Sequence, residues 1–182
     1  MNFFEMLILS QKLHLEDGKI SFYGQDIVIF EPSSLAEYIL EIDNNLELIK
    51  ILYYSAKEAI IENKKNIMNI MDNYKNLEFS QWITKTVNLY AYGRIKFENS
   101  TDIENVILEN SIIANMLKNK VKIPPDHILR GIIAGFVSII KNKNLDCIEI
   151  ECYAIGATNC KLIIGSLDFL KSKYTNLCEA QI

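Results

Sequence analysis

The sequence predicts one soluble globular domain that mixes short strands with longer amphipathic helices. At 182 residues the chain is long enough to bury a substantial core. Its 49% hydrophobic and 23% charged content is ordinary for a folded soluble protein. Apolar residues recur at two different periods along the chain, alternating in some stretches and following helical spacing in others.

The first part of the chain carries strand signals. Residues 13–30 alternate between apolar and polar side chains and contain Asp17-Gly18, a strong hairpin signal, so two or three short strands are expected. Ser34 and Glu37 form a capping box, which predicts a helix that starts at Ser34 and runs to about Ile42.

The middle of the chain predicts helices and then a pair of strands. The longest helical pattern covers residues 46–71, with a polar region at 62–66 that is either solvated or kinked. The elements expected after it are a helix over 79–90, strands over 94–98 and 105–110, and a short helix over 112–119.

The stretch from Pro124 to Ile164 predicts a buried helix followed by a hairpin. Asp126 suits the N-cap, and the apolar residues of 128–140 cover most of the helix circumference, as in a buried helix. Gly131 and Gly135 each weaken a helix interior by about 1 kcal/mol relative to alanine, so close approach of a neighbour or a ligand should compensate. Expected next are strands over 147–154 and 160–165, a turn over 156–159, a helix from 166 to about 174, and a loose tail from 175.

Composition excludes some classes of function. The net charge of -4 and pI of about 5.3 argue against general nucleic-acid binding, which needs a positive surface. The longest strongly apolar stretch, Ile128–Ile140, is too short to span a bilayer, and the first residues lack the basic region of a signal peptide. We therefore expect a cytoplasmic protein with reduced cysteines, no nucleic-acid partner and no membrane insertion.

Five residues suggest a metal site. Cys152 and Cys160 flank a short turn, with Glu149 three residues before Cys152 and with Asp126 and His127 at the start of the preceding helix. Two thiolates, a carboxylate and one more N or O donor would suit tetrahedral Zn²⁺. Strict alternation places Glu149 and Cys152 on opposite strand faces, so joint ligation needs a bulge or a strand edge. The plainer interpretation makes the cysteines core residues, Asp126 a helix cap and His127 a surface residue.

No catalytic constellation stands out. The chain has two histidines, His14 and His127, and lacks G-x-S-x-G, P-loop and G-x-G-x-x-G patterns. Cys147 and Cys178 are interpreted as structural. Several aromatic residues could line an apolar cavity, although each taken singly is more typical of a core; they are Tyr53, Tyr54, Trp82, Tyr90, Tyr92 and Phe136.

The C-terminal part of the chain resembles the 4-vinyl reductase domain family, also described as predicted hydrocarbon-binding proteins. The family pattern is a helix with two glycines, a strand ending in E-x-x-C, a turn with glycine and a second cysteine. Its elements here are Gly131 and Gly135, Glu149 and Cys152, Gly156, and Cys160. The similarity is good over roughly residues 90–165, and the order of the earlier elements also agrees.

This resemblance implies an α+β fold, in which an antiparallel sheet packs against helices, shared with the TRAPP Golgi-transport subunits. It implies a single ligand-binding domain over residues 1–182, a homodimer, and a central pocket for a small hydrophobic ligand. The candidate pocket residues are Trp82, Tyr90, Gly131, Gly135 and Phe136.

The resemblance also connects the chain to the sensor domains of bacterial phenol-responsive activators. Those domains bind zinc through a cysteine ahead of the glycine helix, a glutamate and two later cysteines. Glu149, Cys152 and Cys160 match the last three ligands. Asp126 occupies the position of the first cysteine and His127 follows it, so either could complete a structural zinc site.

Three functions stay open. The preferred hypothesis is a binding protein that holds a small hydrocarbon or aromatic-type ligand and carries a structural zinc. The alternatives are a protein-interaction module of the TRAPP type, or an accessory subunit of an enzyme acting on a tetrapyrrole or other vinyl-bearing compound. A closed four-ligand zinc site leaves no open position for catalysis, so binding is expected rather than enzyme activity.

Overall fold

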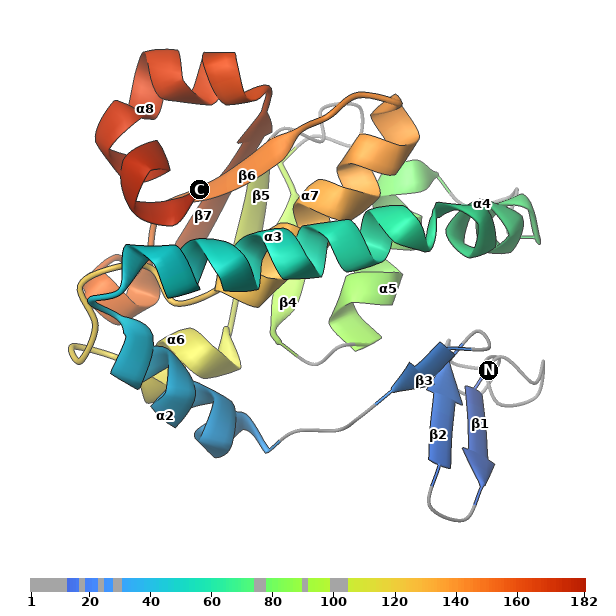
Figure 1. The fold of residues 1–182 in the computed structure, drawn as a ribbon, viewed down its shortest axis with the longest axis horizontal. Coiled ribbons are helices and arrows are strands. Elements are labelled where there is room, and N and C mark those ends of the chain that lie inside the picture. Colours follow the sequence, from blue (N-terminus) through green and yellow to red (C-terminus); the bar gives the residue numbers. More distant parts are fainter. Residues whose placement is uncertain are drawn as a thin grey trace. The chain divides into compact units, whose positions relative to one another are not determined.

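The computed structural model describes residues 13–16, 19–22, 25–27, 31–73, 78–89, 92–98 and 105–182 (Figure 1). The chain divides into two compact units, Met1–Glu31 and Pro32–Ile182. The first unit contains an antiparallel sheet with the order β1-β2-β3, whose strands are β1 (Leu13–Glu16), β2 (Lys19–Phe22) and β3 (Gln25–Ile27). The strands expected there are confirmed, while the Asp17-Gly18 turn lies outside the described residues.

The second unit is built on a four-stranded antiparallel sheet with the order β4-β5-β7-β6. Its strands are β4 (Arg94–Phe97), β5 (Asn105–Glu109), β6 (Asp146–Glu151) and β7 (Cys160–Gly165). Its helices are α2 (Pro32–Ile42), α3 (Leu46–Glu62), α4 (Lys64–Asn73), α5 (Phe79–Leu89), α6 (Ile112–Met116), α7 (His127–Lys141) and α8 (Leu167–Gln181). Helices α5, α7 and α8 contact the sheet, and α3 lies along α7 (Figure 1). The predicted α+β class is confirmed.

Helix α7 is the buried helix of this unit, as its apolar circumference predicts. Every residue from His127 to Ile139 is buried except Ile128. Its two glycines face α3: a Cβ atom at Gly131 would overlap the carbonyl oxygen of Tyr53, and one at Gly135 would lie 2.7 Å from Cβ of Ile60. The close approach expected of these glycines is therefore an approach to a neighbouring helix.

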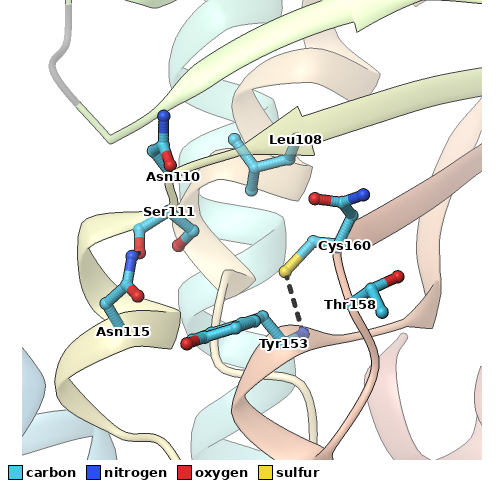
Figure 2. A pocket seen from close by; sticks show the side chains of 8 residues that line it. Leu108, Asn110, Ser111, Asn115, Tyr153, Thr158 and Cys160 are labelled. Carbon is cyan, nitrogen blue, oxygen red and sulfur yellow. Dashed lines mark hydrogen bonds between the residues drawn. The ribbon is translucent and has the colours of Figure 1, made fainter.

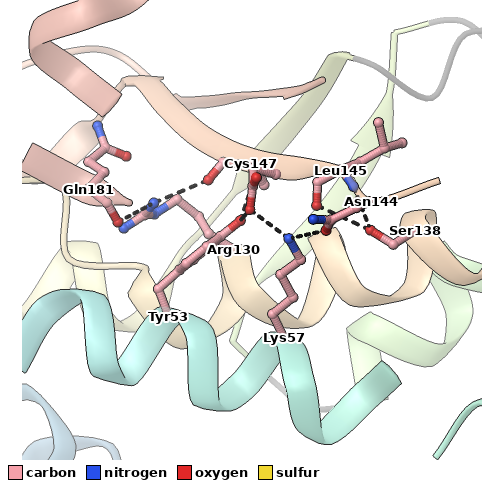
Figure 3. A network of polar contacts seen from close by, with 9 residues as sticks. Tyr53, Lys57, Arg130, Ser138, Asn144, Leu145, Cys147 and Gln181 are labelled. Carbon is pink, nitrogen blue, oxygen red and sulfur yellow. Dashed lines mark hydrogen bonds and ion pairs between the residues drawn. The ribbon is translucent and has the colours of Figure 1, made fainter. Parts of the chain in front are cut away.

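A buried polar cluster ties α3 to the start of β6 (Figure 3). The Tyr53 hydroxyl donates to Oδ1 of Asp146 at 2.9 Å, and Nζ of Lys57 donates to the same oxygen at 2.7 Å. The Cys147 backbone N–H in turn donates to the Tyr53 hydroxyl at 2.9 Å. Because Lys57 and Asp146 are both buried, each charge depends on the other for compensation.

Three boundaries differ from the prediction. Helix α2 begins at Pro32, so the prediction that Ser34 starts the helix is wrong; proline is favoured in a first helical turn. The polar region at 62–66 is a break, since α3 ends at Glu62 and α4 begins at Lys64. The tail expected to be loose is instead the second half of α8, which continues past a non-helical Tyr174 and has Cys178 and Gln181 buried. Among the described residues, no helix is long and apolar enough to cross a membrane.

The glycine contact generates a stability prediction. We expect Gly131→Ala and Gly135→Ala each to lower the free energy of unfolding by about 1–3 kcal/mol, because the new methyl group would overlap α3. Lys141→Ala, on the exposed last turn of the same helix, should change it little. Urea unfolding monitored by circular dichroism measures all three, and unchanged stability in both glycine variants would contradict the close packing.

Candidate metal centre

A bulge at the end of β6 brings Glu149 and Cys152 to the same site. In the pairing of β6 with β7, Glu149 lies opposite Leu162, whereas Glu151 lies opposite Lys161, so β6 holds one extra residue between them. An extra residue reverses the alternation of side chains beyond it. The sequence-based requirement for a bulge, without which the glutamate and the cysteine would point apart, is therefore met.

Four acid and thiol side chains gather around this bulge. The ligand atoms of Glu149, Cys152 and Cys160 all lie within 4.8 Å of one another. The two Sγ atoms are 3.9 Å apart, and Sγ of Cys160 is also 3.9 Å from Oδ2 of Asp126. All four residues are buried. This arrangement is the cluster expected from the sequence, now assembled from the start of α7 and the facing ends of β6 and β7.

The structure distinguishes Asp126 from His127. Asp126 occupies the N-cap position of α7, but its side chain makes no capping bond and instead accepts the Ser111 hydroxyl at 2.8 and 3.1 Å. His127 is buried, so its interpretation as a surface residue is wrong. Its Nδ1 lies 2.9 Å from Nη2 of Arg130. Asp126 is therefore the residue that the structure brings to Cys160.

Glu149 is the most costly group of the cluster. It is fully buried, and neither carboxylate oxygen has a hydrogen-bond partner among the described residues. Burial, and then the charge of Asp126, raise its pKa well above the usual range. An ionised carboxylate in this position costs several kcal/mol of desolvation free energy. The group therefore requires either a proton or a neighbouring cation.

The other members of the cluster also favour protons or a cation. Burial raises the pKa of Asp126 to about 6, opposed by the Ser111 hydrogen bond and the positive charge of Arg130. The hydrogen bond with Cys152, burial and the two nearby carboxylates raise the pKa of Cys160. A divalent cation could replace the protons held by this cluster, because metal binding and deprotonation are coupled.

The positive charge of Arg130 lies behind the cluster. Arg130 is fully buried, and its guanidinium lies over the Tyr53 ring, 5.2 Å from the centroid. Its Nη1 donates to the carbonyl oxygens of Cys147 at 3.2 Å and Gln181 at 3.4 Å (Figure 3). Arg130 thus joins α7, β6 and the end of α8 while it offsets part of the negative charge of the site.

Gln181 is a site residue that the sequence analysis missed. Its side-chain amide accepts the backbone N–H of Glu149 at 2.9 Å and donates to the backbone carbonyl of Glu149 at 2.8 Å. The end of α8 therefore fixes the backbone of one candidate ligand. No spacing or motif in the sequence links residues 149 and 181.

The predicted pocket residues divide into two groups. Trp82 and Phe136 are buried in a T-shaped ring contact with centroids 5.4 Å apart, and Nε1 of Trp82 has no hydrogen-bond partner among the described residues. Gly131 and Gly135 face α3. Tyr90 lies outside the described residues. The structural role predicted for Cys147 and Cys178 fits their positions, since both are buried free thiols.

A polar cavity of about 140 Å³ adjoins the metal centre (Figure 2). Its wall carries mainly side-chain amides and hydroxyl groups, and the thiol of Cys160 reaches it from the cluster. The lining residues are Leu108, Asn110, Ser111, Asn115, Tyr153, Thr158, Asn159 and Cys160.

The fold and site define an α+β domain with a buried acid–thiol centre beside a glycine-bearing helix. The family model of the 4-vinyl reductase domain matches residues 106–166, which include both glycines and the four clustered residues. The resemblance to this family is therefore confirmed over this segment. A comparison with curated proteins finds no match.

A solved structure with the same fold is the phenol-responsive sensory domain of the transcription activator PoxR, determined with phenol. The similarity has a TM-score of 0.70 and covers 96% of this chain and 94% of that chain. The sequences are 12% identical, so the likeness shows a shared fold.

The Gln181 contact generates a second prediction. We expect Gln181→Ala to lower the free energy of unfolding by roughly 2 kcal/mol or more, because it leaves a buried N–H and a carbonyl without partners. Glu179→Ala, at an exposed position in the same turn, is the matched control. Thermal and urea unfolding provide the measurement. Equal stability of the two variants would show that the amide pairing contributes nothing.

Proposed function

We propose that this protein binds a small, mostly apolar molecule in a domain whose fold is stabilised by a structural zinc ion. The observation that carries the proposal is the buried, unpartnered carboxylate of Glu149 beside two thiols and Asp126. The family resemblance implies zinc at this position, and the ligand-binding role follows from the same resemblance and from the fold shared with a phenol-responsive sensory domain.

The residues present fit zinc. Thiolate and carboxylate oxygen are both common ligands of Zn²⁺, and four protein ligands are typical of structural rather than catalytic zinc. Asp126, Glu149, Cys152 and Cys160 would hold the ion. The ion would supply the positive charge that the Glu149 carboxylate lacks, and its binding free energy would add to the stability of the fold.

Metal content is the direct test of this site. We expect about one zinc per chain in protein purified without chelator or affinity-tag metal, measured by elemental mass spectrometry. Cys160→Ser and Glu149→Gln should lose the metal, whereas Cys178→Ser should keep it because Cys178 lies outside the cluster. Asp126→Asn should weaken zinc binding more than His127→Gln does. Wild-type protein free of metal, or the opposite order of these two variants, would contradict the proposed ligand set.

Trp82 and Phe136 are the proposed contacts of the apolar ligand. The two rings supply an aromatic surface, and the indole N–H of Trp82, which has no partner among the described residues, can donate to a hydroxyl or carbonyl oxygen of an otherwise apolar molecule. The PoxR domain was solved with phenol, which has this combination of groups. We therefore propose a small aromatic or hydrocarbon ligand with a single polar group.

Ligand binding can be followed through Trp82, the sole tryptophan of the chain. We expect phenol and alkyl phenols to change its fluorescence saturably, while glycerol does not. Phe136→Leu should weaken binding by about tenfold, and Phe169→Leu, at an exposed position, should not. Isothermal titration calorimetry provides a check that does not depend on the fluorophore. An absence of binding heat with every compound of this class would refute the ligand proposal.

Three further expectations from the sequence stay predictions. They are the homodimer, the cytoplasmic location, and a single ligand-binding domain spanning residues 1–182.

A further inference from the structure

The polar cavity gives the buried thiol of Cys160 a route to solvent. Cys160 is only 1% exposed, yet its side chain forms part of the cavity wall (Figure 2). Among the described residues, the cavity lining carries amide, hydroxyl and phenol groups and no carboxylate, ammonium or guanidinium group. A cavity of about 140 Å³ with this lining admits small uncharged molecules that hydrogen-bond. Cys152 does not line it, so the two thiols differ in access.

The two thiols are also placed to react with each other. Glu151 pairs with Lys161, so the next residues along the two chains, Cys152 and Cys160, lie opposite one another. Residues opposite each other in antiparallel strands have Cα atoms about 4.5–5.5 Å apart, which is within the range that a disulfide spans. Their Sγ atoms are already 3.9 Å apart. Side-chain rotation, without a shift of either strand, is enough to join them.

The Cys160 sulfur is held by one further contact. The backbone N–H of Tyr153, at the start of the turn after Cys152, donates to Sγ of Cys160 at 3.3 Å. A backbone donor of this kind favours the thiolate, which is the form that reacts with oxidants. Of the two cysteines, Cys160 is therefore both the accessible one and the one with this donor.

We propose that Cys152 and Cys160 form an oxidisable pair, which closes into a disulfide when a small neutral peroxide enters the polar cavity. Cys160 attacks one peroxide oxygen, the O–O bond breaks, and a sulfenic acid and water form. Cys152 then attacks that sulfur, and a second water leaves as the S–S bond forms. In total, two thiols and one hydrogen peroxide give one disulfide and two waters, with one electron lost by each sulfur.

Oxidation would remove two of the four proposed metal ligands at once. A disulfide sulfur lacks the negative charge of a thiolate, so Asp126 and Glu149 alone would be left to hold the ion. The metal would then be released. Metal release rests on the proposed zinc site, whereas disulfide formation rests on the thiol pair alone.

The test uses the full chain in metal-loaded and chelator-treated forms, each exposed to hydrogen peroxide. We expect the intact mass to fall by two hydrogens, and peptide mapping to link Cys152 to Cys160 while Cys147 and Cys178 stay reduced. Dithiothreitol should reverse the change. In the metal-loaded form, a chromogenic zinc indicator should report one ion released for each disulfide formed.

Access through the cavity is tested by a matched pair of variants. Thr158→Phe places a large ring at the exposed wall of the cavity, and Asn176→Phe places the same ring at an exposed position on α8. We expect the first to slow oxidation by roughly fivefold or more, because oxidation follows exposure of the thiol, and the second to leave the rate unchanged.

Three outcomes would overturn the inference: a bond to a different cysteine, over-oxidation of Cys160 without linkage, or equal rates in the two phenylalanine variants. The zinc proposal fails separately. A chain that carries no metal but still links Cys152 to Cys160 would refute the zinc site and support the oxidisable pair. A chain that holds zinc and forms no disulfide would do the reverse.

Discussion

The backbone contact between α3 and α7 is the constraint on which the rest of the second unit depends. Gly131 and Gly135 let the two helices approach until the backbone of one meets the backbone of the other. At that separation, Tyr53 and Lys57 reach past α7 to the start of β6. A larger side chain at either glycine would move α3 outward and break those polar contacts. Packing and buried hydrogen bonding therefore stand or fall together here.

The same contact positions the candidate metal centre. Helix α7 is held against the sheet along its length, so the residue before its first turn, Asp126, lies beside the facing ends of β6 and β7. Arg130, one turn further along, then reaches the carbonyl oxygens of β6 and α8. The negative cluster and the positive charge behind it are thus fixed by one helix, and neither depends on a surface loop.

The parts of the structure that the sequence predicts well are local. The buried helix follows from its apolar circumference, and the approach of Glu149, Cys152 and Cys160 follows from a hairpin with one bulge. The choice between Asp126 and His127 could not be made in this way. It depends on the Ser111 hydroxyl and the Arg130 guanidinium, whose positions are set by tertiary packing.

The contacts that the sequence does not reveal join residues far apart in the chain. The buried pair of Lys57 and Asp146 spans 89 positions, and a surface lysine would have the same sequence signature. Gln181 was assigned to a loose tail because its neighbours are polar, yet it is fully buried. A helix such as α8 that packs through a few side chains has too weak a periodicity to be recognised without its partner.

The pairing of Gln181 with Glu149 has a consequence for the sheet as a whole. Strand β6 lies at an edge of the order β4-β5-β7-β6, and an exposed edge is a template for pairing with strands of other molecules. At Glu149 the outward N–H and carbonyl are both occupied by one amide side chain, as a fifth strand would occupy them. Gln181 thereby ends the sheet at this position and protects the protein against edge-to-edge aggregation.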